Sequence, residues 1–273
     1  MVLTIKNTKQ FAIFYLICFL LYYAWAFYCN LLFSLTKPVY FLNKLDLSLN
    51  LILNTGLQHA IIHHKWVCIL LDITYFFLPV ILVFAYVNNK QIHKSFALFT
   101  AFFNVVYCLL FSTLSVISVE VYIAWMLVPL IFYSNTLKGF YFSIQSIRIL
   151  FVIFFLSAAL WKLFTGSVFN KEQFSAILIV QHCNYIVSSS TNYFSNFIMY
   201  LINNSGFSYI IFLAGFFIEF SFILALFTKK FDKFLGYIFI LFLIVDYMLL
   251  GINYFYWLPF LGCLYFSKHS IDI

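Results

Sequence analysis

Residues 148–166 read RILFVIFFLSAALWKLFTG, and this stretch decides the fold. Apart from Arg148 at its start and Lys162 near its end, it carries no ionisable side chain. It is long enough to cross the hydrocarbon core of a bilayer, which takes roughly 20 apolar residues. A charge inside such a run is costly, so Lys162 is a candidate functional residue by default.

The composition of the whole chain agrees with a membrane protein. Of the 273 residues, 65% are hydrophobic and only 8% are charged, whereas soluble domains carry about 25% charged residues. The net charge of +7 comes from scattered lysines without a basic block, which argues against a nucleic-acid partner. The 39 Phe, 20 Tyr and single arginine are typical of AT-rich coding DNA, and they indicate a low-GC bacterium.

Eight apolar segments are candidate membrane spans. Six are long, at residues 10–35, 66–87, 95–118, 142–164, 208–228 and 233–252, and two are short, at 121–134 and 254–267. The sequence therefore predicts an all-α, polytopic transmembrane bundle of about eight helices, forming a single integral membrane domain over residues 1–273. Two segments are not expected to cross: 38–65, an interfacial helix on the outer face, and 166–206, a long loop of the kind that is often functional.

The distribution of lysines predicts the orientation. An N-terminus inside the cell places nine lysines on the cytoplasmic side and five outside, so both termini are expected in the cytoplasm of a bacterium, with the chain in its inner membrane. The inside set is Lys6, Lys9, Lys90, Lys94, Lys138, Lys229, Lys230, Lys233 and Lys268, and the outside set is Lys37, Lys44, Lys65, Lys162 and Lys171.

Four ionisable residues fall in the outer half of this predicted bundle. With a rise of 1.5 Å per residue, Lys162 lies near the outer boundary, Asp72 and Asp246 lie deeper, and Glu219 lies near the middle. They predict an outward-facing polar pocket for an amphipathic ligand such as a quinone. Lys162, Glu219 and Asp246 are its candidate catalytic residues.

Arg148, Asp72 and Trp161 are candidate ligand-binding residues. Several of the candidates could instead have a purely structural role. Lys162 could simply reach the headgroups, and Asp72 could bond to a tyrosine or a backbone donor. Arg148 lies nearer the inner boundary and could be an anchor there. It is nevertheless on the same helix face as Lys162, because fourteen residues make nearly four turns.

The histidines give only a weak metal signal. His59 and His63 are four residues apart, His64 follows, and His182 could add a third ligand. The glutamate of a metalloprotease HExxH motif is missing, and the six cysteines form no CxxC pair. We expect an interfacial histidine cluster and no metal.

The segment from Arg148 onward resembles a known family. RILFVIFFLSAALWKL (148–163), followed by FTGSVFNKEQF, is similar to a helix of the vitamin K-dependent gamma-carboxylase-like family (the HTTM superfamily). That helix reads as an apolar run, a small residue and Lys-Leu. The following helices, with Glu219 before a basic turn and Asp246 before an aromatic-rich last span, extend the resemblance over residues 142–267. The four-helix DoxX-like proteins share a similar arginine, lysine and glutamate pattern.

The resemblance implies that Lys162 acts as a base on a quinol, in redox or modification chemistry on a lipid or an exported peptide. A lysine is a base only when neutral; desolvation favours the neutral amine and a nearby carboxylate opposes it. The chain departs from the family at Asp246, where histidine is frequent, and it has no counterpart of the animal enzyme's soluble domain, so carboxylation of protein glutamates is not expected.

Bacterial relatives include a maturation factor for a peptide toxin. The alternative is therefore a non-enzymatic membrane subunit or maturation factor for a small exported or membrane-bound partner. A transporter is disfavoured, because no internal repeat is visible.

Overall fold

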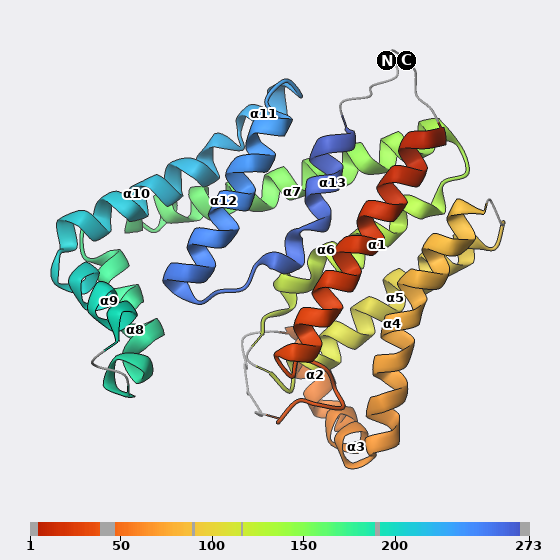
Figure 1. Cartoon of the computed structure of the whole chain (residues 1–273), viewed down its shortest axis with the longest axis horizontal. Helices are drawn as coiled ribbons and strands as arrows, with labels where there is room; N and C mark the ends of the chain where they lie inside the picture. The colour runs from red at the N-terminus through yellow and green to blue at the C-terminus, as the bar shows by residue number, and fades with distance from the viewer. Residues whose placement is uncertain (1–4, 39–46, 89–90, 116, 189–191, 268–273) are drawn as a thin grey trace. The chain divides into compact units, whose positions relative to one another are not determined.

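The structure, a computed structural model, describes residues 5–38, 47–88, 91–115, 117–188 and 192–267, and every regular element in these ranges is a helix (Figure 1). Six helical stretches in the described residues are long and apolar enough to cross a membrane, as in a multi-pass membrane protein. These stretches are α1 (Ile5–Tyr28), α4 (Lys65–Val87), α5 (His93–Ser112), α7 (Leu137–Phe164), α10 (Ser205–Ser221) continued by α11 (Leu224–Phe227), and α12 (Asp232–Leu250). The all-α prediction is confirmed.

The two short predicted spans are irregular helices. Residues 119–133 form η1 (Val119–Tyr122), α6 (Ile123–Leu127) and η2 (Val128–Tyr133), and residues 255–266 form η4 (Phe255–Trp257) and α13 (Pro259–Phe266). Pro129 and Pro259 each lie in the first turn of a helical element. Proline has no N–H to donate and favours the first turn of a helix, and here each proline coincides with the start of a new helical element. By length, neither segment is a full span.

Several limits predicted from the sequence were wrong. The span predicted to reach residue 118 ends at Ser112, as α5. The first span was extended to residue 35, but α1 ends at Tyr28 and Asn30 adopts a left-handed backbone with φ of 58°. The segment 166–206 is not a loop, because it contains η3 (Ser167–Phe169), α8 (Gln173–Ser188) and α9 (Tyr193–Asn203). Asn192 caps α9 by accepting a hydrogen bond from the Phe194 N–H at 3.3 Å. The polar residues that resemble a loop thus mark a helix start.

The predicted interfacial segment is helical where it is described. It forms α2 (Leu47–Thr55) and α3 (Leu57–His63), separated by Gly56 in the left-handed region. Residues 39–46 and 189–191, which belong to the two predicted non-spanning segments, lie outside the described residues, as do Lys44, Lys90 and Lys268.

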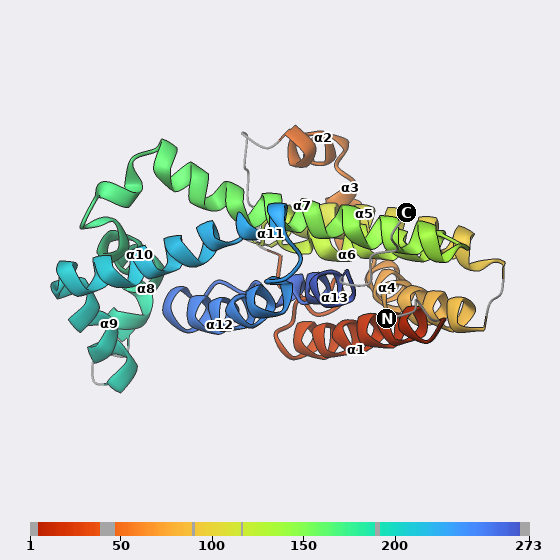
Figure 2. The same ribbon diagram turned by 90° about the horizontal axis from the view of Figure 1, so that it is seen from above.

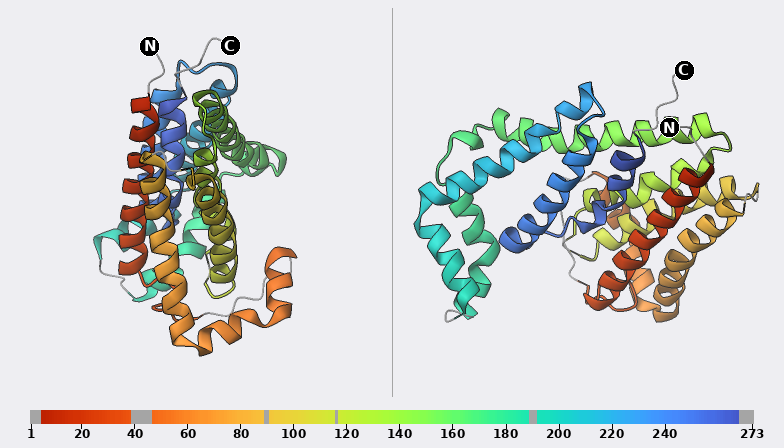
Figure 3. Two further views of the ribbon diagram at one scale, coloured as in Figure 1. Left: turned by 90° about the vertical axis from the view of Figure 1, so that its right-hand side faces the viewer. Right: turned by 45° about the horizontal axis from the view of Figure 1, so that its top comes forward.

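The contacts group the chain into two compact units, and the single membrane domain stays a prediction. The first unit comprises residues 1–147 and 255–273. In it α4 runs beside α1 (Figure 3), α13 packs against α1, and α5 packs against α4 and η2. Its core is aromatic: the rings of Tyr75 and Tyr107 stack at 4.0 Å, and those of Tyr22 and Trp125 at 4.9 Å. Stacked aromatic pairs add to the stabilisation from burial alone.

The second unit comprises residues 148–254 and lies within the part of the chain that carries the family resemblance. It contains the later half of α7 and helices α8 to α12, with α8 and α9 packed against each other and against α10 (Figure 2). Phe155 of α7 packs against α12 and the end of α10, its ring centroid lying 5.5 Å from that of Phe239 and 4.4 Å from that of Phe222. These contacts fix the side of α7 that faces the other helices.

Candidate functional site

Lys162 and Glu219 form an ion pair that joins α7 to α10. The Lys162 Nζ donates to both carboxylate oxygens of Glu219, each at 2.7 Å, and it lies 5.5 Å from the centroid of the Phe212 ring. The Glu219 side chain is 6% exposed and that of Lys162 is 27% exposed. Lys162 therefore turns toward the protein while part of its stem stays accessible.

Two glycines end the helices that carry the basic and acidic groups. Gly166, with φ of 72°, follows α7 four residues after Lys162, and Gly251, with φ of 67°, follows α12 five residues after Asp246. Glycine adopts this left-handed conformation without the penalty that a Cβ imposes. Each helix thus stops about one turn beyond its ionisable side chain.

An apolar cavity of about 320 Å³ lies between α8, α10 and α12. Its lining is apolar except for Lys162, Glu219 and Asp246, and the remaining members are Phe174, Ile177, Ile211, Phe212, Ala214, Gly215, Ile218, Leu241, Phe242, Val245, Leu249 and Leu250. Among the described residues, the buried Oδ2 of Asp246 has no hydrogen-bond partner. Apolar walls with a few convergent polar groups are typical of small-molecule sites, whose volumes start at about 300 Å³.

A second, more open cavity of about 550 Å³ adjoins the first. It lies at the end of α7, along η3 and at the start of α8, and its lining is Trp161, Lys162, Thr165, Gly166, Ser167, Asn170, Gln173, Ile177 and Phe212. Lys162, Ile177 and Phe212 line both cavities. Lys162 therefore lies at the junction between a polar, open space and an apolar one.

Arg148 forms a separate ion pair with Asp232. Its Nε donates to Asp232 Oδ2 at 2.8 Å, and its Nη2 donates to Asp232 Oδ1 at 2.6 Å and to the Ala225 carbonyl at 2.7 Å. Both side chains are almost fully buried, at 2% and 0% exposure. Arg148 lines neither cavity of this unit, so the structure does not bring it together with the Lys162 group.

The ion pair affects the pKa of Lys229, in the loop that precedes α12. Burial lowers the pKa of Lys229, and the positive charge of Arg148 lowers it further, while Asp232 partly opposes the shift. Asp232 was missed from the sequence, where it reads as one acid within the basic loop KKFDK. The signal that points to it is the single arginine, because a buried guanidinium needs a carboxylate partner.

Asp72 belongs to the first unit and fastens the turn after α1. Its Oδ1 accepts hydrogen bonds from the Phe33 N–H at 3.1 Å and the Tyr107 hydroxyl at 2.7 Å, and its Oδ2 accepts one from the Ser34 N–H at 2.8 Å. The alternative of a tyrosine or backbone donor is confirmed, and both kinds of donor are present. These contacts explain why a buried carboxylate is tolerated here.

We expect Asp72→Asn to lower the free energy of unfolding by about 2 kcal/mol, because an amide cannot accept all three hydrogen bonds of the carboxylate. Tyr107→Phe removes one donor and is expected to cost about 1.5 kcal/mol. Detergent unfolding curves followed by circular dichroism measure both changes. Equal stability of Asp72→Asn and the unaltered chain would show that the carboxylate does not hold the turn.

The remaining candidates lie apart from the ion pairs. Trp161 lines the open cavity and is 65% exposed, with its ring stacked 5.8 Å from that of Phe164. The His182 Nε2 lies 2.7 Å from the Leu249 carbonyl oxygen, which ties α8 to α12. His59 and His63 are in α3, and His64 follows it. The searched part of the chain holds no cluster of three or more His, Cys, Asp or Glu side chains.

Comparisons with known proteins give no relative. No family model matches the chain, and no curated protein or solved structure matches it significantly. The resemblance to the gamma-carboxylase-like and DoxX-like families therefore stays a prediction.

Proposed function

We propose that this chain is a multi-pass protein of a bacterial inner membrane that binds a quinone-type ligand in the apolar cavity of its second unit. The observation that carries the proposal is the cavity itself, with apolar walls and three ionisable side chains on one lining. A quinol has the matching chemistry, since its ring and tail are apolar and its hydroxyl groups are hydrogen-bond donors. The unpartnered Asp246 Oδ2 is an acceptor for such a hydroxyl.

Proton transfer in this site involves Lys162 and Glu219 together. In the ion pair Lys162 is protonated and donates to Glu219. It becomes a base only when that proton moves to the Glu219 carboxylate, which leaves a neutral amine at the cavity wall. Asp246 positions the ligand hydroxyl, and Trp161 borders the open cavity from which water reaches Lys162.

The same proposal covers orientation and partners. With both termini in the cytoplasm, the end of α7 that carries Lys162 faces outward, where a lipid or an exported peptide would be modified. The two short apolar segments, Val119–Tyr133 and Phe255–Phe266, would complete eight crossings if they tilt or lie in thinned bilayer. Support for the enzyme also comes from the resemblance of residues 142–267 to the carboxylase-like family.

A non-enzymatic role is the second candidate, and the ion pairs favour it. Lys162–Glu219 and Arg148–Asp232 each satisfy both partners and hold α7 to other helices of the unit. The α8–α9 hairpin also exposes large apolar side chains, among them Val180, Val187 and Tyr193. Such a module would act as a membrane subunit or maturation factor that receives a small exported partner.

Gly215→Leu is expected to weaken the binding of a short-chain naphthoquinol. Gly215 lines the apolar cavity, and a Cβ there meets no atom within 4 Å, so a leucine extends into empty space without disturbing α10. The loss should be at least about ten-fold in Kd. Isothermal titration calorimetry of the detergent-solubilised chain measures it.

Gly206→Leu is the matched control. Gly206 lies in the same helix, its Cβ would also meet nothing within 4 Å, and it lines neither cavity of this unit. We expect unchanged binding in this variant. If both leucine variants bind the naphthoquinol as tightly as the unaltered chain, the cavity is not the ligand site, and the non-enzymatic role is favoured.

A further inference from the structure

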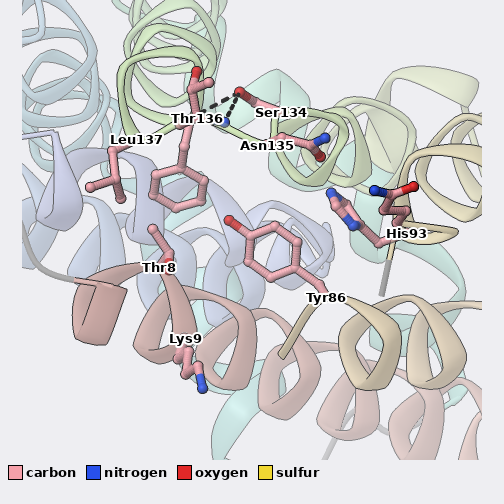
Figure 4. Close-up of a pocket in the computed structure, with 10 residues that line it drawn as sticks. Thr8, Lys9, Tyr86, His93, Ser134, Asn135, Thr136 and Leu137 are labelled. Atoms are coloured by element: carbon pink, nitrogen blue, oxygen red, sulfur yellow. Dashed lines mark hydrogen bonds between the residues drawn. The ribbon is translucent and has the colours of Figure 1, made fainter. Parts of the chain in front are cut away.

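A cavity of about 380 Å³ lies in the first unit, where four candidate spans begin or end (Figure 4). Lys9 is near the start of α1, Tyr86 near the end of α4, His93 at the start of α5 and Leu137 at the start of α7. A site at the ends of spanning helices lies at the boundary between hydrocarbon and headgroups. The cavity is in a different unit from the proposed quinone site, and it has a different chemistry.

The lining of this cavity is polar and carries no negative charge. Lys9 supplies an ammonium group, and His93 supplies a ring that is 6% exposed and packs edge-on against Tyr86 at 5.2 Å. In Figure 4 the side chains of Asn135 and Thr136 lie on the far side of Tyr86 from Lys9, whose ammonium group points away from them. No carboxylate lies within ion-pair distance of Lys9 among the described residues. The lining thus offers several donors and one uncompensated cation.

The backbone adds positive potential. Helices α5 and α7 both begin in the lining, at His93 and Leu137, and a helix start carries roughly half a positive charge from its N–H groups. The residue before α5, Ile92, provides no side-chain cap. The start of α7 is ordered by Thr136, whose Oγ1 accepts a hydrogen bond from the Gly139 N–H at 3.1 Å.

The residues around the cavity are also positively charged. Lys94 and Lys138 are the residues next to His93 and Leu137 in the first turns of α5 and α7. The acids among the described residues of the first unit are Asp72 and Glu120, and neither lines the cavity. A ligand here is therefore an anion that accepts hydrogen bonds, and a phosphate group meets both requirements.

We propose that this cavity binds a phosphate group, and that the phosphate belongs to the headgroup of an anionic phospholipid. Basic pockets between transmembrane helices at the membrane boundary bind such headgroups. Lys9 pairs with the phosphate once its flexible stem rotates toward the polar side chains, and the hydroxyl and amide side chains donate to it. Leu137 and Phe140 contact the apolar part of the lipid. The bound headgroup joins α1, α4, α5 and α7 at one end of the first unit.

The test is lipid retention by the full chain, measured by native mass spectrometry from detergent. Phosphatidylglycerol is compared with phosphatidylcholine of the same acyl chains. The variants are Lys9→Gln and Asn135→Asp, which removes a donor and adds a negative charge at nearly constant size. Lys138→Gln is the control, because Lys138 is exposed near the cavity without lining it.

We expect the unaltered chain and Lys138→Gln to retain phosphatidylglycerol in preference to phosphatidylcholine. Lys9→Gln and Asn135→Asp should each weaken that retention by about ten-fold. Equal retention of phosphatidylglycerol by all four chains, or no preference for it over phosphatidylcholine in the unaltered chain, would overturn the headgroup assignment.

A second measurement separates a lipid headgroup from free phosphate. In lipid-free detergent, inorganic phosphate at matched ionic strength should raise the Tm of the unaltered chain but not that of Asn135→Asp. A phosphate effect together with a phosphatidylglycerol preference supports the headgroup. A phosphate effect without that preference identifies free phosphate and overturns the lipid, and the absence of both overturns the site.

Discussion

Replacing Arg148 with methionine is expected to lower the free energy of unfolding by about 3–5 kcal/mol, because it removes the guanidinium that pairs with the buried Asp232 carboxylate. Asp232 is fully buried and receives two hydrogen bonds from Arg148. The same change also removes the donor to the Ala225 carbonyl. Unfolding in mixed detergent and dodecyl sulfate micelles, followed by circular dichroism, measures the loss.

Two further variants test the cause of that loss. The double variant Arg148→Met with Asp232→Leu should recover most of the stability, since replacing both members of a buried ion pair with apolar side chains is often neutral or stabilising. Lys171→Met removes an exposed lysine of the same unit and should change little. If Arg148→Met alone is as stable as Lys171→Met, the buried ion pair does not hold the unit together.

In the ion pair between Lys162 and Glu219, Lys162→Met is expected to lower the free energy of unfolding more than Glu219→Gln does. It leaves the Glu219 carboxylate, which is 6% exposed, on the wall of an apolar cavity. Because Lys162 itself is 27% exposed, we expect a loss of about 2–3 kcal/mol rather than the full penalty for a buried pair. Glu219→Gln should cost only about 1 kcal/mol, since the ammonium group can reach the open cavity.

The double variant Lys162→Met with Glu219→Gln distinguishes proton transfer by Lys162 from a structural role of the ion pair. Its stability should return to near that of the unaltered chain, because no uncompensated charge remains. If the ion pair only joins helices, naphthoquinol binding and growth of cells that depend on the gene should return as well. If Lys162 transfers a proton, stability and binding return while cellular function stays lost.

The sequence predicts the long helices well and the short ones badly. A continuous apolar run of about 20 residues has one stable arrangement in a bilayer, so α4, α7 and α12 begin and end within a few residues of their predicted limits. The runs that became α8 and α9 are shorter and mixed with Asn and Ser, and their helical state depends on packing against α10. That packing cannot be predicted from the local amino-acid composition.

The sequence predicts how deep the candidate site residues lie in the bilayer, but not which way their side chains point. A rise per residue places Lys162, Asp246 and Glu219 at increasing depth within the outer half of the bundle, and the structure places all three on one cavity. Which of them pair depends on how each helix is rotated about its axis, and only packing of side chains such as Phe155 fixes that rotation. For the same reason the sequence did not pair Arg148 with Asp232.

The position of Lys162 on the walls of two cavities has a consequence for the order of events in the site. On the proposed function, a ligand in the apolar cavity and water in the open cavity would both contact this one flexible side chain. Movement of its ammonium group away from Glu219 would open a wet path, and its return would close that path. On the proposed function, proton exchange with water and entry of the ligand would therefore take place in different cavities that share Lys162.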